Sequence, residues 1–238
     1  MAISLPTLSN INVVSTTANY SAKSNLTEHP GSYLTQATIL VYDDILRFQK
    51  SSSGYFTTEQ INDFVYHAFE GNALWFMDEL VGIESDWKKT ASASSTTAYG
   101  YVQFTEDSVE TAVNRYVGHL ERFNERKDIR DWSPYGIPLG AEIKTPEWLT
   151  ILKNSTKSHE EKLDALTYDQ TIALAFIHLH SSKSKDSNFR LLSKGDVTAA
   201  KDLYKNNHHT NPDAATLNRL TSFFTIHYKP AQQLAFGG

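Results

Sequence analysis

The sequence predicts a mainly α-helical protein. Apolar residues recur three and four positions apart in several stretches, which is the spacing that brings them onto one face of a helix. Helix-capping signals precede two of these stretches, at Thr57 with Gln60 and at Thr167 with Gln170. Strand signals are few, since no Asn-Gly or Asp-Gly turn is flanked by alternating apolar and polar residues.

The N-terminal region differs in character from the rest of the chain. Residues 1–35 are rich in Ser, Thr and Asn and show no period, which is typical of an extended arm. A first helix is expected over residues 36–48, before the SSSG run at 51–54. We therefore divide the chain into residues 1–50, an N-terminal arm and helix, and residues 51–238, a helical domain that the arm extends.

Three helices are expected in the first half of this domain. Thr57 caps the first, and Asn72 caps the second, which ends near Glu84. A loop of mostly Ala, Ser and Thr follows at residues 90–97. Thr105 caps the third helix, whose apolar residues fall on one face as far as position 123.

The second half is expected to contain the central helix. Residues 130–144 hold two prolines and two glycines and are typical of a surface excursion. Thr145-Pro146 then opens a short helix with Pro in its first turn. The helix headed by Thr167 is apolar nearly all round at residues 172–177, which predicts burial on every side. Asp196 and Asn211-Pro212 begin the last two helices.

Composition excludes several classes of function. The net charge is −5 and no cluster of Lys and Arg stands out, which argues against nucleic acid as a partner. The chain has no cysteine, so disulfides, zinc-thiolate sites and thiol nucleophiles are excluded. No apolar run approaches the roughly 20 residues of a membrane-spanning helix. The first residues lack the basic and apolar regions of a secretory signal, so no signal peptide is expected.

Glu84 is the candidate catalytic acid. On a helix it continues the apolar stripe formed by Met77, Leu80 and Val81. An apolar surface penalises the charged form of a carboxyl group, raises its pKa and keeps it protonated, as the general acid of a glycosidase must be. The alternative is an ordinary acid at a helix end that faces water.

The stretch 98–105, AYGYVQFT, is the candidate binding loop. A glycine between aromatic residues, Gly100, allows the backbone to approach a ligand closely. Tyr99 offers a flat apolar face, and the Gln103 amide can bind hydroxyl and N-acetyl groups of sugars. The alternative is a packed turn that leads into the next helix, with its aromatic residues in the core.

Taken together, these segments resemble the lytic transglycosylase family related to goose-type lysozyme. The family has Glu-Ser at a helix end, a small-residue loop, a Gly-Leu-Met-Gln motif and a later Ala-Tyr-Asn element. Glu84 and Ser85 match the first motif, and Gly100 and Gln103 match the second, with Tyr-Val in place of Leu-Met. Tyr204 is the best match to the tyrosine of the third motif. The resemblance covers roughly residues 57–225 and implies a lysozyme-like helical domain.

In the third motif the residue after the tyrosine is Lys205, where the family has Asn. The resemblance implies Glu84 as the catalytic acid and Ser85, Tyr99, Gly100, Gln103 and Tyr204 as substrate-binding residues.

The resemblance also implies a reaction. Glu84 protonates the oxygen between N-acetylmuramic acid and N-acetylglucosamine, the substrate's N-acetyl group stabilises the charge at C1, and the muramoyl 6-hydroxyl closes a 1,6-anhydro ring. Two alternatives stay open: a hydrolytic muramidase, should Glu106 or Asp107 reach the cleft, and a non-catalytic virion structural or wall-binding protein. Glu106 and Asp107 are otherwise expected to stabilise the dipole of the helix that Thr105 caps, and Tyr116 is expected in the core.

No cofactor is expected. His208 and His209 are adjacent in a predicted loop, and His178 and His180 face apart on a predicted helix, so neither pair favours a metal site. The expected partner is the glycan strand of bacterial peptidoglycan, with virion or tail proteins as further candidates. A wall-degrading enzyme without a signal peptide suits a bacteriophage product, carried in the virion or made in the host cytoplasm before release.

Overall fold

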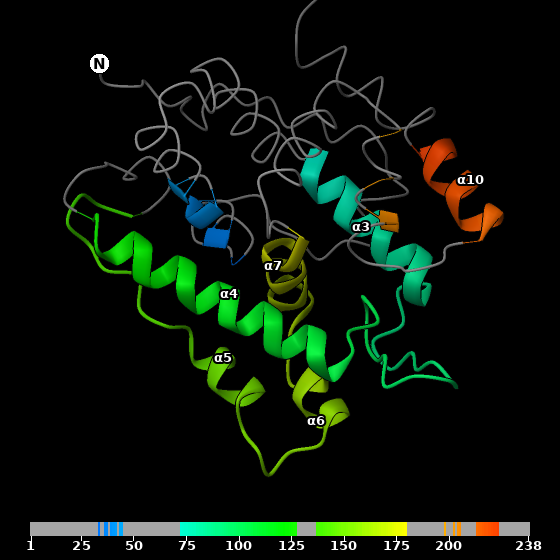
Figure 1. Cartoon of the computed structure of the whole chain (residues 1–238), viewed down its shortest axis with the longest axis horizontal. Coiled ribbons are helices and arrows are strands. Elements are labelled where there is room, and N and C mark those ends of the chain that lie inside the picture. Colours follow the sequence, from blue (N-terminus) through cyan, green and yellow to red (C-terminus); the bar gives the residue numbers. More distant parts are fainter. Residues whose placement is uncertain are drawn as a thin grey trace, which may run out of the picture.

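The computed structural model describes the helical part of the chain. The described residues are 33, 36, 37, 39–41, 43, 44, 72–127, 137–179, 198, 202, 204, 205 and 213–223. Six helices lie in this part: α3 (Asn72–Ser85), α4 (Glu106–Asn124), α5 (Glu147–Leu152), α6 (His159–Asp164), α7 (Tyr168–Leu179) and α10 (Ala214–Phe223) (Figure 1). No strand occurs among the described residues, which confirms the mainly α class. None of their helices has the length and apolar character needed to cross a membrane.

Several expected elements fall outside these residues. They include the helix headed by Thr57, the start of a helix at Asp196 and, apart from Tyr33, the predicted arm over residues 1–35. The described residues 33, 36, 37, 39–41, 43 and 44 are all helical, so helical backbone occurs at Tyr33, before the predicted start at 36. The helix expected after Asn211-Pro212 is α10, which begins at Ala214.

Helix α7 is the central helix, as its apolar sequence predicts. Its positions 171–177 are all buried, and α4 and α3 both pack against it (Figure 1). Helix α4 presents one apolar face to this core, because its large side chains recur at helical spacing. The buried residues of α4 are Val109, Ala112, Val113, Tyr116, His119, Leu120 and Phe123.

Capping interactions fix the helix starts that lead out of the loops. The Thr105 side chain accepts a hydrogen bond from the Ser108 N–H, and the Ser108 hydroxyl bonds back to the Thr105 backbone. Thr167 and Gln170 form the predicted reciprocal pair at α7. Pro146 is the N-cap of α5 and has no capping side chain, so the prediction that it lies inside the first turn is wrong by one position.

A short segment at the N-terminal end belongs to the same core. Ala37, Ile39, Leu40 and Val41 are at most 2% exposed. The Tyr116 hydroxyl donates to Gln36 Oε1 at 2.8 Å, so the core position of Tyr116 comes with a satisfied hydrogen bond. Burial of this segment means that the described residues between 33 and 44 share a core with α4 and α7.

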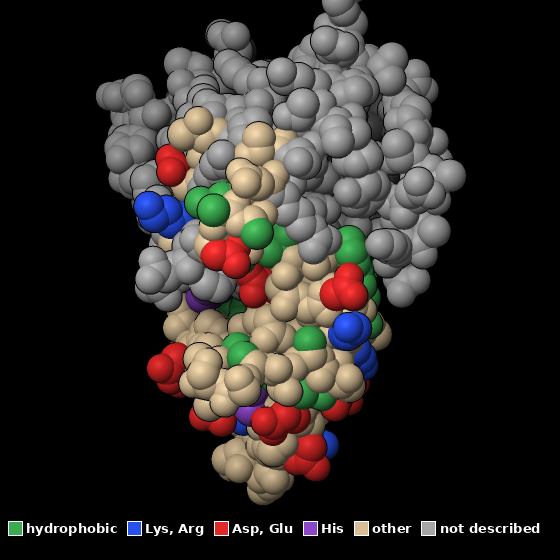
Figure 2. All heavy atoms as spheres, turned by 90° about the vertical axis from the view of Figure 1, so that its right-hand side faces the viewer, with side chains coloured by type: hydrophobic (Ala, Val, Ile, Leu, Met, Phe, Trp, Pro, Cys, Tyr) green, Lys and Arg blue, Asp and Glu red, His purple; other side chains and the backbone are tan. Residues whose placement is uncertain are grey.

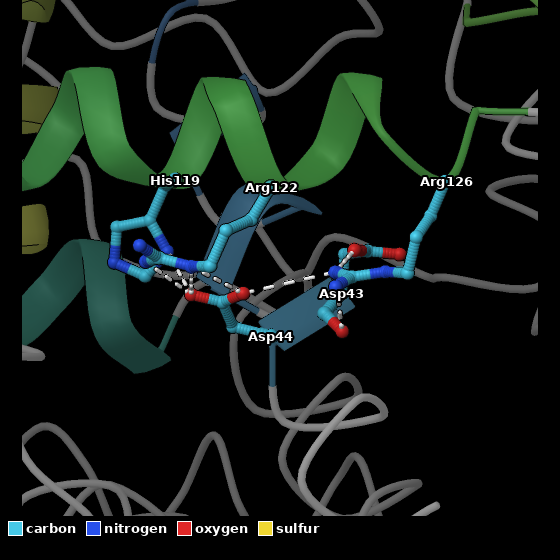
Figure 3. Close-up of polar contacts among 5 residues, drawn as sticks. All are labelled: Asp43, Asp44, His119, Arg122 and Arg126. Atoms are coloured by element: carbon cyan, nitrogen blue, oxygen red, sulfur yellow. Dashed lines mark hydrogen bonds and ion pairs between the residues drawn. The ribbon is translucent and has the colours of Figure 1, made fainter.

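Charge pairs hold this segment against α4. Arg122 donates to both oxygens of Asp44, with Nε 3.0 and 2.9 Å from them, and His119 Nδ1 lies 2.6 Å from Asp44 Oδ2 (Figure 3). Asp43 pairs with Arg126, just beyond the helix end (Figure 3). Burial alone would raise the pKa of the Asp44 carboxyl, but the hydrogen bonds and charges of His119 and Arg122 outweigh it and hold that pKa well below its usual range.

Candidate active site

Glu84 lies in the last turn of α3, where the core gives way to the surface. Met77, Leu80 and Val81 are fully buried, and Glu84, which continues their stripe, is half-buried. The hydroxyl of Tyr204, 120 residues further along the chain, donates a hydrogen bond to Glu84 Oε1. The fold therefore brings together two of the predicted site residues.

Ser85 has its hydroxyl engaged inside the helix. The side chain is buried, and Oγ donates to the carbonyl oxygen of Val81 at 3.0 Å. This is the usual bond of a helical serine to the carbonyl four residues earlier. Ser85, which was predicted to bind substrate, therefore uses its hydroxyl to hydrogen-bond the last turn of α3 in this structure.

The chain reverses sharply directly after Glu84 and Ser85. Asp86 and Trp87 both have positive φ, 52° and 57°, in the left-handed region that non-glycine residues rarely adopt. The Lys88 N–H donates to the Ser85 carbonyl at 3.0 Å, which closes the turn. Backbone strain of this kind gathers at functional sites, and here it lies next to the candidate acid.

The candidate binding loop forms a tight turn. Tyr99 and Phe104 exchange two backbone hydrogen bonds, of 3.0 and 3.1 Å, which closes the four residues between them. Gln103 Nε2 donates to the carbonyls of Ala91 and Gly100 at 3.0 and 2.9 Å. Because both partners are acceptors, the amide nitrogen must face them. The amide oxygen is then the group that Gln103 can offer to a ligand.

The aromatic residues of the loop pack against the protein. The Tyr99 side chain is 9% exposed, and its hydroxyl donates to Asp164 in α6 at 3.0 Å. Burial first, and then Asp164, raise the pKa of Tyr99. The Tyr101 ring meets Tyr168 edge-to-face at 4.9 Å. These contacts match the packed-turn alternative more closely than a loop whose aromatic faces are turned to a ligand.

A small cavity lies beneath the loop. It is lined in part by Lys89, Tyr99, Gly100 and Leu163 and has a volume of about 10 Å³. Such a space holds about one water molecule, so it cannot accept a sugar ring.

The backbone conformation at position 100 favours glycine. Its φ is +82°, whereas a Cβ would meet no heavy atom closer than the Lys89 carbonyl oxygen at 3.7 Å. We expect Gly100→Ala to lower the free energy of unfolding by roughly 1–2 kcal/mol, because the left-handed conformation carries that cost for an L side chain. Urea denaturation measures the change. Ser95→Ala, at an exposed position of the preceding loop at residues 90–97, should stay within about 0.5 kcal/mol of the parent. An equal effect of both substitutions would refute the explanation.

Other candidate groups lie elsewhere. Glu106 and Asp107 are exposed in the first turn of α4, as expected for residues that stabilise a helix dipole. Among the described residues no group of three His, Asp or Glu side chains could hold a metal ion. His180, His208 and His209 lie outside them, so the absence of a metal site stays a prediction.

Asp213 is a charged residue near this site that sequence reasoning did not assign to it. Its carboxylate accepts a hydrogen bond from the Thr216 N–H at 2.7 Å and so caps α10, which packs against α3. Burial first, then the hydrogen bond to Glu84 and the charges of Glu84 and Asp213, raise the pKa of the Tyr204 hydroxyl well above its usual range. The sequence signals a helix start at Asn211-Pro212, but no local pattern relates that start to Tyr204.

The surface on the side of α10 has a mixed charge. Figure 2 turns the right-hand side of Figure 1 toward the viewer and shows Asp and Glu side chains scattered among polar groups, with Lys and Arg in small separate groups. The described part of this face carries no continuous basic patch of the kind that a phosphate backbone requires.

No family model, no curated protein and no solved structure matches this chain. The functional assignment consequently depends on the residues and geometry described above.

Proposed function

We propose that this protein is a lytic transglycosylase that cleaves the glycan strands of bacterial peptidoglycan, with Glu84 as the catalytic acid of a lysozyme-like helical domain. The observation that carries the proposal is the half-buried Glu84 at the end of α3, with its carboxyl group held by the Tyr204 hydroxyl. The match of Glu84, Ser85, Gly100 and Gln103 to the family motifs adds support.

The environment of Glu84 suits an acid that delivers a proton. The buried stripe of α3 beside it disfavours the charged form, and the hydrogen bond that Tyr204 donates opposes this effect. Tyr204 donates to Oε1, so the proton of the neutral acid belongs on the other oxygen, Oε2, and the carboxyl group is oriented. A proton held at a fixed oxygen can be passed to a glycosidic oxygen in the substrate.

The product is proposed to carry a 1,6-anhydro ring. Glu106 and Asp107, the acids whose presence in the cleft would favour a water-using reaction, are exposed at the start of α4. One carboxyl group then serves first as acid and afterwards as the base that takes the proton of the muramoyl 6-hydroxyl. Hydrolysis is the second candidate, and a second carboxylate in the cleft would favour it.

Mass spectrometry of purified peptidoglycan after digestion distinguishes these reactions. We expect anhydro-muropeptides to be the main soluble products, and Glu106→Gln to give the same products as the parent protein. Muropeptides with reducing ends as the main products would show that the reaction is hydrolysis and would refute the transglycosylase assignment. A wall preparation that releases no soluble fragments would refute the proposed function.

A further inference from the structure

The imidazole of His159 is a buried side chain to which the proposed reaction gives no role. His159 is the first residue of α6 and is 7% exposed. Its Nε2 lies 2.7 Å from the carbonyl oxygen of Phe104, the residue that follows Gln103 in the candidate binding loop. Because a carbonyl oxygen can only accept, Nε2 carries the hydrogen and donates. The ring therefore links α6 to the loop that leads into α4 (Figure 1).

The same helix also holds the other end of the turn in this loop. The Tyr99 hydroxyl donates to Asp164, the last residue of α6, at 3.0 Å. Tyr99 and Phe104 are the two residues whose paired backbone hydrogen bonds close the turn. Both ends of the turn are therefore attached to α6, and Gln103 lies between them.

Helix α6 is itself fixed at its start and by a buried side chain. The Ser158 N–H donates to Glu161 Oε2 at 2.8 Å, and the Glu161 N–H donates to Ser158 Oγ at 3.2 Å, so the helix begins with a capping box. Leu163 is buried, and a Cβ added at Gly100 would lie 3.8 Å from its Cδ1. A capped helix packed against the loop in this way can hold the turn in one place.

The position of Gln103 depends on this attachment. Its backbone has a φ of 51°, in the left-handed region that non-glycine residues rarely adopt. Its amide nitrogen donates to the carbonyls of Ala91 and Gly100, which leaves the amide oxygen for a ligand. Such a conformation persists only where the surrounding structure holds it. The carbonyl that His159 binds belongs to the next residue, so a shift of that carbonyl moves the Gln103 backbone and its amide oxygen with it.

We propose that His159 is a positioning residue of the substrate site, which holds the Phe104 carbonyl so that the Gln103 amide oxygen meets a hydroxyl or N-acetyl N–H group of the sugar. The inference rests on the proposed function, because it gives Gln103 a contact with substrate. His159 acts through Gln103 and has no substrate contact of its own.

Met and Gln at position 159 separate the hydrogen bond from the packing of the ring. Both side chains are unbranched and similar in volume, but only Gln can donate to the Phe104 carbonyl. That carbonyl also accepts from the Tyr99 N–H at 3.0 Å, so His159→Met leaves it with a partner and should keep the fold. Lys162→Gln changes a residue of α6 that none of these bonds involves and is the control.

The first measurement follows the loop without a ligand. Exchange of the Gln103 side-chain amide hydrogens with water is measured by NMR, with the signals assigned from their loss in Gln103→Met. We expect His159→Met to speed this exchange by roughly two- to tenfold, the effect of one lost hydrogen bond. His159→Gln should stay closer to the parent, and Lys162→Gln should leave the exchange unchanged. Equal exchange in the parent and in His159→Met would overturn the inference.

The second measurement is the affinity for a tetramer of N-acetylglucosamine, determined by calorimetry in the Glu84→Gln background. We expect His159→Met to weaken binding by roughly two- to tenfold and His159→Gln to restore most of the loss. Because His159 acts through Gln103, His159→Met should have no further effect once Gln103→Met has removed the amide. Additive losses, which a general loosening of the core would give, would overturn the inference. An affinity that His159→Met does not change would overturn it as well.

The two claims can fail separately. If His159→Met speeds the exchange but the parent protein binds no tetramer and cleaves no peptidoglycan, the hold of α6 on the loop is supported and the proposed function is refuted. If the parent protein cleaves peptidoglycan and His159→Met leaves the exchange unchanged, the proposed function is supported and the role of His159 is refuted.

Discussion

Glu84→Gln is expected to lower the rate of peptidoglycan cleavage by roughly 10²–10⁴-fold, the contribution of a positioned general acid. Gln has nearly the shape of Glu, and its amide oxygen can still accept the hydrogen bond from Tyr204. It has no acidic proton to give to the glycosidic oxygen. The release of soluble fragments from purified peptidoglycan measures the change.

Two comparisons make this result specific to the acid. The free energy of unfolding of Glu84→Gln should stay within about 1 kcal/mol of the parent value, since the hydrogen bond is kept. Glu106→Gln, at an exposed position of α4, should cleave at the parent rate. Equal activity of Glu84→Gln and the parent protein would rule out Glu84 as the catalytic acid.

Asp44→Asn is expected to lower the free energy of unfolding by about 3–5 kcal/mol, the usual cost of removing one partner from a buried charge pair. The side chain of Asp44 is 8% exposed and pairs with Arg122 and His119, so the substitution leaves the buried His119 ring and the partly exposed Arg122 guanidinium without their carboxylate. Urea denaturation measures the loss. Asp86→Asn, in an ion pair whose side chains are about 70% exposed, should change the value by less than about 1 kcal/mol.

The same carboxylate predicts a dependence of stability on pH. Because the pKa of Asp44 is lowered on folding, its contribution is fully present above the unfolded value of 3.8 and is lost as pH falls below it. The difference in unfolding free energy between the parent and Asp44→Asn should therefore shrink below about pH 4. A difference that stays constant from pH 7 to pH 3 would contradict the assignment of the effect to this charge.

The central helices could be predicted because their signals are local. The cap at Thr105, the reciprocal pair of Thr167 and Gln170 and the apolar run of α7 each follow from residues a few positions apart. Helix α6 escaped prediction although Ser158 and Glu161 form a capping box. Six residues are too few to display a helical period, and a capping signal alone does not predict a helix.

The candidate site could be predicted only in part, because its contacts join distant segments. The apolar stripe of α3 predicts that Glu84 lies at the edge of the core, but no spacing rule pairs it with Tyr204; that choice came from the family resemblance. The internal hydrogen bonds of Gln103 and the bond from Tyr99 to Asp164 depend on how the loop meets its neighbours. The charge pairs of Asp44 likewise span 75–78 positions and leave no local pattern.

A crystal structure of Glu84→Gln bound to an oligomer of N-acetylglucosamine tests the central claim most directly. We predict that the oligomer lies across the end of α3 and that the side chain at position 84 is about 3 Å from the oxygen linking two sugars, within hydrogen-bonding distance. An oligomer bound away from α3, with the side chain at position 84 turned to bulk water, would contradict the assignment.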